Sequence, residues 1–448
     1  MKPQLPVWWL HPALLFTAVM GGLAAAAAMI PDNLYVDLWS TPKFFDASTE
    51  ALTVFCIAAF ALGATLPGLH LRGWNGARGT QLDAELSAST LLMLYRVATG
   101  LALFGYAVWI AIALSNGMNW QVVMDVVRSK PGAAYLVRSK YLVSAAGITT
   151  CTQFGVASAV LGSLLAARTG WRKIWKSLSL LFALGIARAV LNTERLAVLE
   201  LIVPMVPVIV TLVLGRQASR SGRVRRVIAW APLAGISALF FVFAGFEYGR
   251  SWTTYYSGGS VSFWTFAVSR LAGYYVTALN NGAYLVTRLN APMGVPFFTL
   301  NFLWRFPFLS GLTHLLFPTF DLADTYFDLL NSGANAEFNN GGGLLAPAID
   351  FGVYGMILYW LMIGLITGWV YRNFKRGSAW GLCLYPMLFL GTLEVPRGLY
   401  LSGGRAVPPI CFLLLSAFLL RIKQRRAEGA NVPTTPLPVV ADLQVAIE

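Results

Sequence analysis

Charged residues are scarce in this chain. Only 12% of its 448 residues are Asp, Glu, Lys or Arg, whereas soluble globular proteins carry roughly 25%. The chain has four cysteines and three histidines, and their positions match no spacing of a metal site. The cysteines fall in or at the edge of apolar runs, which indicates core-facing or lipid-facing residues and not disulfides. These absences argue against a soluble domain, a disulfide framework and a metal site.

Short motifs of well-known enzyme mechanisms are also absent. The sequence has no G-x-S-x-G nucleophile elbow, no Walker loop and no H-E-x-x-H zinc motif. The formal net charge of +14 would suit a nucleic acid, but the basic residues stand in short clusters between apolar runs. That placement is typical of the cytoplasmic connections of a membrane protein. We therefore expect no nucleic-acid partner, and we assign no cofactor.

Long apolar runs dominate instead. Hydrophobic residues make up 57% of the chain, and a membrane-spanning helix needs about 20 mostly apolar residues. This criterion predicts an all-α polytopic membrane protein with about ten transmembrane helices. The expected spans cover residues 11–30, 51–68, 88–114, 144–166, 177–192, 196–214, 228–246, 346–370, 379–395 and 404–420. The first run exceeds the core of about 7–15 residues of a signal peptide, so we interpret it as a retained helix.

Lys and Arg residues gather in alternate connections between these spans, for example at 168–176, 216–226 and 372–376. Because cytoplasmic connections are rich in Lys and Arg, we expect both termini in the cytoplasm and the one long connection outside. The expected divisions are helices one to seven at 1–247, an extracytoplasmic loop at 248–345, helices eight to ten at 346–421 and a disordered cytoplasmic tail at 422–448. We expect the loop to contain amphipathic or re-entrant helices and to cover an active site as a lid.

Charged side chains near the outer ends of spans are the candidate functional residues, because charge inside a membrane is costly. The hairpin between the fifth and sixth spans carries Arg188 and Arg195 on either side of a turn. Glu194 lies beside them, and Glu200 lies deeper in the span. Arginines that snorkel to the surface and pair with Glu194 are the alternative interpretation. Two arginines with a glutamate at span depth favour a functional role.

The long loop contributes a second candidate. Its residues 263–290 have a helical spacing that puts Arg270 and Tyr274 on one face, with Asn281 further along. An amphipathic helix that lies at the membrane interface, anchored by tyrosines, is the alternative. The spacing is compatible with both interpretations.

The loop ends in a polar segment before the next span. Glu337, Asn339 and three glycines from Gly341 indicate flexibility, and Asp350 opens the span that follows. Asp350 either caps that helix at its positive N-terminal end or takes part in chemistry. In the turn between the last two spans, Glu394 and Arg397 either form a local ion pair or face a substrate.

A cluster of arginines outside the membrane suits a diphosphate leaving group. Guanidinium groups bind phosphate oxygens through paired hydrogen bonds and stay charged at any working pH. They also stabilise the charge that develops as the diphosphate departs. Aromatic and Asn side chains beside them suit sugar rings and hydroxyls. The residues therefore indicate glycosyl transfer from a lipid diphosphate at the outer leaflet.

With these features, the chain resembles the bacterial O-antigen polymerase family, the Wzy-type oligosaccharide repeat-unit polymerases. The resemblance covers most of the chain and rests on the number of spans, the Arg195 segment followed by an apolar span, and the single large loop in the second half. Within that loop it rests on Arg270 with Tyr274 and Tyr275, and on the D-F-G-x-x-G run that begins at Asp350.

The resemblance implies an inverting, metal-independent membrane glycosyltransferase of the GT-C type in the bacterial cytoplasmic (inner) membrane. Such an enzyme would transfer a growing glycan from undecaprenyl diphosphate to a hydroxyl of an incoming lipid-linked repeat unit, in O-antigen, capsule or exopolysaccharide synthesis. The implied partners are the lipid bilayer, lipid-linked oligosaccharides, a chain-length regulator and a flippase.

By position, Arg195 and Arg270 match the family's essential arginines as diphosphate ligands, and Arg188 and Arg397 match less closely. The residues assigned to substrate binding also include Tyr274, Asn281 and Asn339. The family's general base is not fixed by any motif here, and we expect a carboxylate. The candidates are Glu194, Asp350, Glu394 and, as a non-carboxylate, His314.

Two other functions fit the same class of protein. Another GT-C enzyme, an O-antigen ligase or a polyprenyl-phosphate-sugar transferase, would use Asp32 or Asp37 of the first outer connection. A transporter or flippase of lipid-linked oligosaccharide would place polar residues and broken helices near the middle of the bilayer. The polar residues gather outside the spans, which favours chemistry at the surface.

Overall fold

The computed structural model describes residues 7–69, 86–128, 130, 132–145, 147–192, 194, 196–214, 221–289, 293–306, 309–316 and 322–430. Within these ranges every regular element is helical. Eight helical segments of the described residues are long and apolar enough to cross a membrane. They cover Pro12–Met29, Ala47–Gly68, Ala88–Ser115, Thr149–Thr169, Leu196–Leu214, Gly222–Thr253, Ala346–Lys375 and Val407–Gln424. The prediction of an all-α polytopic membrane protein is confirmed.

Five of these segments lie within one α-helix each: α1 (Pro12–Met29), α3 (Ala47–Leu69), α5 (Ala88–Ser115), α18 (Ala346–Lys375) and α20 (Val407–Ala430). The others are built from shorter pieces: η3 (Thr149–Gln153) with α8 (Phe154–Thr169), α10 (Leu196–Ile202) with α11 (Met205–Val208) and η5 (Ile209–Leu214), and α13 (Gly222–Glu247) with η6 (Tyr248–Tyr256). Pro204 separates α10 from α11, because proline has no N–H to donate to the preceding turn.

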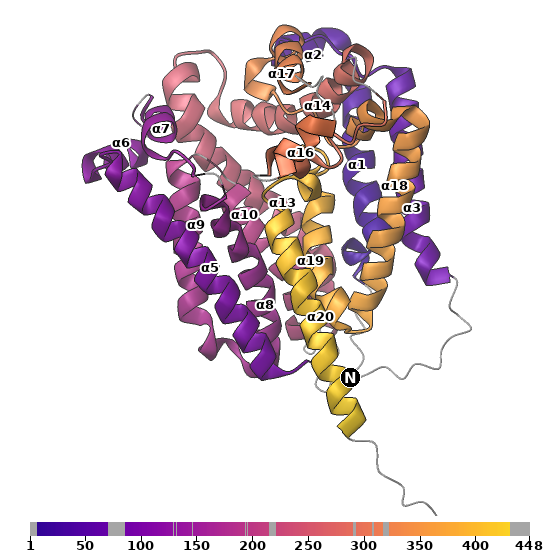
Figure 1. The fold of residues 1–448 in the computed structure, drawn as a ribbon. Helices are drawn as coiled ribbons and strands as arrows, with labels where there is room; N and C mark the ends of the chain where they lie inside the picture. Colours follow the sequence, from indigo (N-terminus) through magenta and orange to yellow (C-terminus); the bar gives the residue numbers. More distant parts are fainter. Residues whose placement is uncertain are drawn as a thin grey trace, which may run out of the picture.

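The two remaining expected spans, 177–192 and 379–395, form shorter helices. They are α9 (Trp175–Leu191), with 17 residues, and α19 (Ala379–Glu394), with 16 residues. At about 1.5 Å per residue each is about 25 Å long, somewhat less than the roughly 30 Å of a bilayer core. In Figure 1 both run alongside the longer helices of the bundle.

The connecting helices gather at one end of the bundle, which we call the loop end (Figure 1). They are α2 (Asp32–Trp39), α6 (Trp120–Val127), α7 (Ala133–Leu136), α14 (Phe263–Arg288), α15 (Asn301–Arg305), α16 (Leu309–Leu316) and α17 (Leu322–Gly333). Elsewhere the chain forms the short 3-10 helices η1 (Trp8–Leu10), η4 (Trp171–Lys173), η7 (Ala336–Phe338) and η8 (Tyr400–Ser402) and the π-helix η2 (Val137–Tyr141).

The end of α20 lies at the opposite end, which we call the tail end (Figure 1). The basic groups at 168–176 and 372–376 lie at that end, where α8 leads into α9 and α18 into α19. An excess of basic residues is typical of cytoplasmic connections, so the expected orientation is the tail end in the cytoplasm. Helix α20 continues to Ala430, past the expected start of the tail at residue 422, and residues 431–448 lie outside the described residues.

Helices α3 and α18 pack with their backbones in close contact. A Cβ atom added to Gly368 would lie 2.3 Å from the carbonyl oxygen of Ala64, and one added to Gly364 would lie 2.3 Å from that of Phe60. The two glycines have the small-x-x-x-small spacing that allows transmembrane helices to approach closely. The stacked rings of Phe16 and Phe60, with centroids 4.0 Å apart, extend this core to α1.

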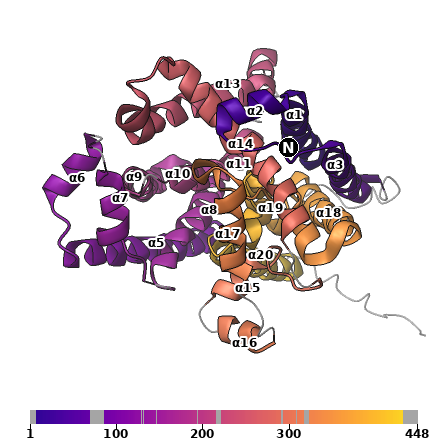
Figure 2. The same ribbon diagram turned by 90° about the horizontal axis from the view of Figure 1, so that it is seen from above.

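Helix α14 lies across the loop end (Figures 1 and 2). Its Ser262 N-cap accepts a hydrogen bond from the N–H of Thr265, and its second half is almost continuously buried from Val276 to Leu285. Trp39 of α2 donates its indole N–H to the carbonyl of Ser269, at 3.1 Å. Helix α14, the longest helix of the described part of this loop, is therefore packed against α2.

Candidate functional site

Three arginines and three glutamates lie close together at the loop end, and we call this group the hairpin cluster. Its members are Arg188, Glu194, Glu200, Glu394, Arg397 and Arg405. They come from the last turn of α9, the connection to α10, α10 itself, the end of α19 and the turn before α20. The cluster thus joins residues of the first seven helices to residues of the last three.

Glu194 is held between two guanidinium groups. Its Oε2 lies 2.8 Å from Nη2 of Arg405 and 3.5 Å from Nη2 of Arg188. Arg188 also donates through Nη1 to the hydroxyl of Thr152, at 2.8 Å. Burial lowers the pKa of Arg405, but the carboxylates of Glu200 and Glu194 outweigh it and raise the pKa above its usual value. Arg405 is therefore permanently charged.

Glu200 is the buried member of the cluster, with 2% of its surface exposed. Its Oε1 lies 3.7 Å from Nε of Arg405 and accepts a hydrogen bond from the hydroxyl of Tyr400, at 3.0 Å. Burial, together with the nearby charge of Glu200, raises the pKa of Tyr400 well above its usual value, so this phenol stays protonated and donates. A buried carboxylate requires such partners, because an unpaired charge away from water is costly.

Glu394 and Arg397 form a local ion pair, which was one of the two interpretations of their positions in the sequence. Nη1 of Arg397 lies 3.3 Å from Oε2 of Glu394. Arg405 also attracts the carboxylate of Glu394 electrostatically, which links this pair to the rest of the cluster.

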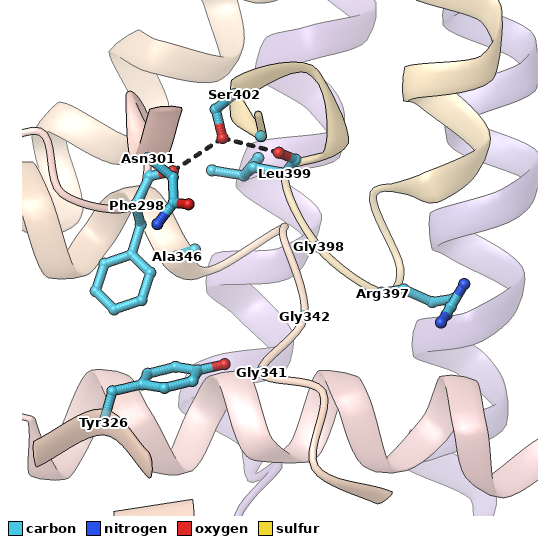
Figure 3. A pocket seen from close by; sticks show the side chains of 11 residues that line it. Phe298, Asn301, Tyr326, Gly341, Gly342, Ala346, Arg397, Gly398, Leu399 and Ser402 are labelled. Atoms are coloured by element: carbon cyan, nitrogen blue, oxygen red, sulfur yellow. Dashed lines mark hydrogen bonds between the residues drawn. The ribbon is translucent and has the colours of Figure 1, made fainter. Parts of the chain in front are cut away.

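A cavity of about 200 Å³ lies beside this pair. Its lining consists of Phe298, Asn301, Tyr326, Gly341, Gly342, Ala346, Arg397, Gly398, Leu399, Ser402 and Gly403. Figure 3 shows the rings of Phe298 and Tyr326 on one side of the glycine segments and the guanidinium of Arg397 pointing away on the other. The segments at 341–342 and 397–398 thus separate the cavity from the charged group of Arg397.

Asp350 positions one wall of this cavity. Its Oδ2 accepts hydrogen bonds from the N–H of Phe298 at 3.0 Å, from the N–H of Thr299 at 2.8 Å and from the hydroxyl of Thr299 at 2.7 Å. Helix α18 begins at Ala346 with Leu345 as its N-cap, so Asp350 does not cap this helix. The helix breaks two residues later at Gly352, where φ is 70°. Asp350 instead fixes the segment that carries Phe298.

Arg270 lies in a second group, which we call the Arg270 clamp. Its Nε lies 3.1 Å from Oε2 of the fully buried Glu247, and its Nη1 contacts the carboxylate of Glu337. The rings of Tyr256, Phe266, Tyr274 and Phe338 surround the guanidinium, with centroids 5.1–5.9 Å from Cζ. Burial lowers the pKa of Arg270, but Glu337 and Glu247 raise it overall.

The clamp ties the end of α13 and the η7 turn to α14. Arg270 and Tyr274 lie on the same face of α14, as the helical spacing predicted. Arg270 lies eight residues before Ala278, the residue whose carbonyl faces Gly342, so about 12 Å of helix separates the clamp from the glycine segments. Among the described residues no ion pair joins the clamp to the hairpin cluster.

Asn281 of the loop forms hydrogen bonds to backbone carbonyls. Nδ2 of Asn281 donates to the carbonyls of Phe338 and Asn340, at 2.7 and 3.0 Å. Asn339 is exposed between these two acceptors. The glycines that follow are tightly packed, because a Cβ atom on Gly343 would lie 2.6 Å from the carbonyl carbon of Gly398. The segment expected to be flexible is therefore fixed on both sides.

Two of the predicted site residues cannot be placed. Arg195 lies outside the described residues, as does the side chain of His314. The structure brings together Arg188, Glu194 and Arg397 in the hairpin cluster but places Arg270, Tyr274, Asn281 and Asp350 elsewhere at the loop end. Sequence reasoning did not select Arg405, although it stands before the last span; for Tyr400 no signal was available. Within the described residues no group of three His, Cys, Asp or Glu side chains is arranged to hold a metal ion.

The fold and these clusters define a polytopic helical membrane protein with two groups of ion-paired side chains at its loop end. Comparison of the chain with protein-family models, with curated proteins and with solved structures finds no match.

Proposed function

We propose that this protein is an oligosaccharide repeat-unit polymerase of the bacterial cytoplasmic membrane. It transfers a growing glycan from undecaprenyl diphosphate to a hydroxyl group of a second lipid-linked repeat unit. The observation that carries the proposal is the hairpin cluster, in which three guanidinium groups lie at one end of an apolar helix bundle. A lipid diphosphate presents its charge at that depth, just outside the hydrocarbon of the bilayer.

Arg188 and Arg405 supply the charge that a diphosphate needs. Both now share the carboxylate of Glu194. A diphosphate offers more oxygens than one carboxylate, and guanidinium groups bind such oxygens through paired hydrogen bonds. When the diphosphate replaces Glu194 between the two arginines, it releases this carboxylate.

Glu194 then acts as the general base. The hydroxyl oxygen of the acceptor attacks the anomeric carbon of the donor glycan, and the bond from that carbon to the diphosphate oxygen breaks with inversion. Glu194 takes the hydroxyl proton, and the departing diphosphate keeps the bonding electrons. Negative charge develops on the diphosphate oxygens as this bond breaks. Arg188 and Arg405 stabilise that charge, so they stabilise the transition state more than the ground state.

Glu200 and Tyr400 position this machinery. Glu200 is buried beside Arg405, and Tyr400 donates a hydrogen bond to Glu200. Arg405 therefore keeps one carboxylate partner when a diphosphate displaces the other, which holds its guanidinium plane in place.

The test uses purified protein in lipid nanodiscs and an undecaprenyl-diphosphate-linked repeat unit. We expect glycans of two or more repeat units on lipid. One molecule of free undecaprenyl diphosphate should appear for each glycosidic bond formed. Arg405→Gln removes both products. If the wild-type protein moves the lipid-linked unit across the nanodisc or proteoliposome bilayer without forming longer glycans, the protein is a transporter instead.

A different GT-C enzyme is the second candidate, and the position of α2 is the observation that favours it. Asp32 and Asp37 lie on this helix at the loop end, and the Asp32 side chain is 87% exposed although it lies 3.8 Å from Lys43. An accessible carboxylate suits a ligase or a polyprenyl-phosphate-sugar transferase that uses one Asp as its base. In that enzyme the single substitution Asp32→Ala or Asp37→Ala abolishes transfer.

A further inference from the structure

We propose that the cavity beside Gly398 binds one uncharged sugar ring of the glycan substrate. The cavity has a volume of about 200 Å³ and is lined by two aromatic rings, an amide, a hydroxyl and glycine backbone. The choice of a sugar as its occupant rests on the proposed function. The cavity adjoins the hairpin cluster, and Arg397 is the residue that the two have in common.

Phe298 and Tyr326 form an apolar corner of the cavity. Their ring centroids are 5.5 Å apart and their planes are inclined by 50°. Aromatic faces carry partial negative charge and attract the weakly positive C–H groups that one face of a pyranose presents. Binding pockets for small molecules commonly combine such apolar walls with a few polar groups that set orientation.

Asn301 and Ser402 supply the polar groups. Among the described residues the amide of Asn301 has no hydrogen-bond partner, and Figure 3 shows it beside Phe298 at the cavity. The Ser402 hydroxyl is placed to donate to the carbonyls of Phe298 and Leu399, at 3.0 and 2.8 Å. Its oxygen retains lone pairs that can accept from a sugar hydroxyl, and the amide can both donate and accept.

The lining favours a neutral sugar over a uronic acid. Arg397 is the one cation among the lining residues, and its guanidinium points away from the rings toward Glu394, at 3.3 Å (Figure 3). A carboxylate in this cavity would lose water without gaining a charged partner, which is costly.

The cavity is also built in advance of binding. Asp350 holds the backbone of Phe298 and Thr299, and the N–H of Gly343 donates to the carbonyl of Val395, at 2.9 Å. Gly342 has a φ of 65°, which favours glycine and turns the chain along the cavity wall. Because these walls are already rigid, little conformational entropy of the protein is lost when a ligand binds.

Gly398 provides a test that does not disturb the fold. A Cβ atom added to this lining residue has no heavy atom within 4 Å, and the same is true of Gly404, which lies in the same turn but does not line the cavity. Gly398→Ala therefore adds a methyl group to a lining residue without a steric clash, and Gly404→Ala is the matched control. Tyr326→Ala removes part of the apolar corner.

The experiment measures the binding of methyl glycosides to the full chain in detergent micelles by saturation-transfer NMR. The probes are the methyl glycosides of glucose, galactose, N-acetylglucosamine and glucuronic acid. We expect at least one neutral glycoside to bind, with a dissociation constant that rises about tenfold or more in Gly398→Ala and in Tyr326→Ala. Gly404→Ala should bind as the wild type does, and the glucuronide should bind more weakly than the neutral probe.

Two outcomes overturn the proposal: no neutral glycoside binds to the wild-type protein, or binding is the same in Gly398→Ala and Gly404→Ala. The proposed function is tested separately, because Arg405→Gln should abolish glycan formation and leave glycoside binding unchanged. Glycoside binding without any polymer formation would reject the polymerase and keep the sugar site. Polymer formation that is insensitive to Gly398→Ala, with unchanged glycoside binding, would reject the sugar site alone.

Discussion

The guanidinium of Arg405 lies 2.8 Å from the carboxylate of Glu194. This contact joins the connection between α9 and α10 to the start of α20, so it forms only after the last helix has packed into the bundle. The same carboxylate reaches Arg188, at 3.5 Å. The candidate site is thus assembled from the first and the second half of the chain, and neither half contains it alone.

Arg405→Gln should reduce polymer formation by about 100-fold or more, the effect of removing one donor that stabilises a developing anion. Arg405→Lys should restore little, because lysine keeps the charge but lacks the paired geometry. The measurement is the length distribution of glycan made by nanodisc-embedded protein. Arg172→Gln, an exposed arginine of the η4 turn at the tail end, is the control and should behave as the wild type. Full chain length in Arg405→Gln would remove this residue from the mechanism.

Arg270→Ala should also abolish long glycans, but through the stability of the loop. The substitution removes the guanidinium that pairs with the buried carboxylate of Glu247, and breaking a buried ion pair costs about 3–5 kcal/mol. We expect a clear fall in the melting temperature of the detergent-solubilised protein. The double variant Arg270→Met with Glu247→Gln removes both charges and should recover much of the lost stability. An Arg270→Ala protein that melts like the wild type and yet makes no polymer would show that Arg270 binds the substrate directly.

The fold was largely predictable, because the signal for a membrane span is local. Runs of apolar residues gave α1, α3 and α5 within a few residues of their ends. Helical spacing placed Arg270 and Tyr274 on one face in the same way. The end of α20 was not predicted correctly, because the helix continues to Ala430. The density of charged residues and prolines does not determine where a helix ends once it has left the membrane.

The site was less predictable, because its contacts join distant parts of the chain. Nothing in the sequence around Glu194 indicates that Arg405 lies beside it. Asp350 had two plausible local roles, and its actual partners are backbone groups of Phe298 and Thr299 in the preceding loop. The partners of Arg270, Glu247 and Glu337, come from the end of a span and a flexible-looking segment, where pairing depends on how the loop folds back.

Asp350→Ala should weaken the cavity wall. It removes the acceptor of three hydrogen bonds from the Phe298–Thr299 segment, and each buried donor left without a partner costs about 1–3 kcal/mol. The expected results are a lower melting temperature and weaker binding of the neutral methyl glycoside. Thr299→Val, which removes only the hydroxyl, should show a smaller effect of the same kind. Unchanged glycoside binding in Asp350→Ala would mean that Phe298 keeps its position without this carboxylate.

Gly368→Leu should prevent assembly of the bundle. Its side chain would have to occupy the space taken by the backbone of Ala64, which a Cβ atom alone approaches to 2.3 Å. The expected result is loss of folded protein from the membrane fraction, measured by size-exclusion chromatography after detergent extraction. Gly22→Leu on α1 is the control, since a Cβ atom there has no neighbour within 4 Å. Equal yields of the two variants would contradict the close packing of α3 against α18.

Asp32→Ala and Asp37→Ala decide between the two enzyme classes. In the proposed polymerase the base is Glu194, and the exposed Asp32 carboxylate lies 3.8 Å from Nζ of the largely buried Lys43. Exposed ion pairs contribute about 0–1 kcal/mol, so both variants should fold and polymerise like the wild type. Glu194→Gln keeps the shape of the side chain but cannot take a proton, and it should lose activity by about 100-fold or more. The opposite pattern, in which either Asp variant is inactive and Glu194→Gln is active, would assign the protein to the ligase or sugar-transferase class.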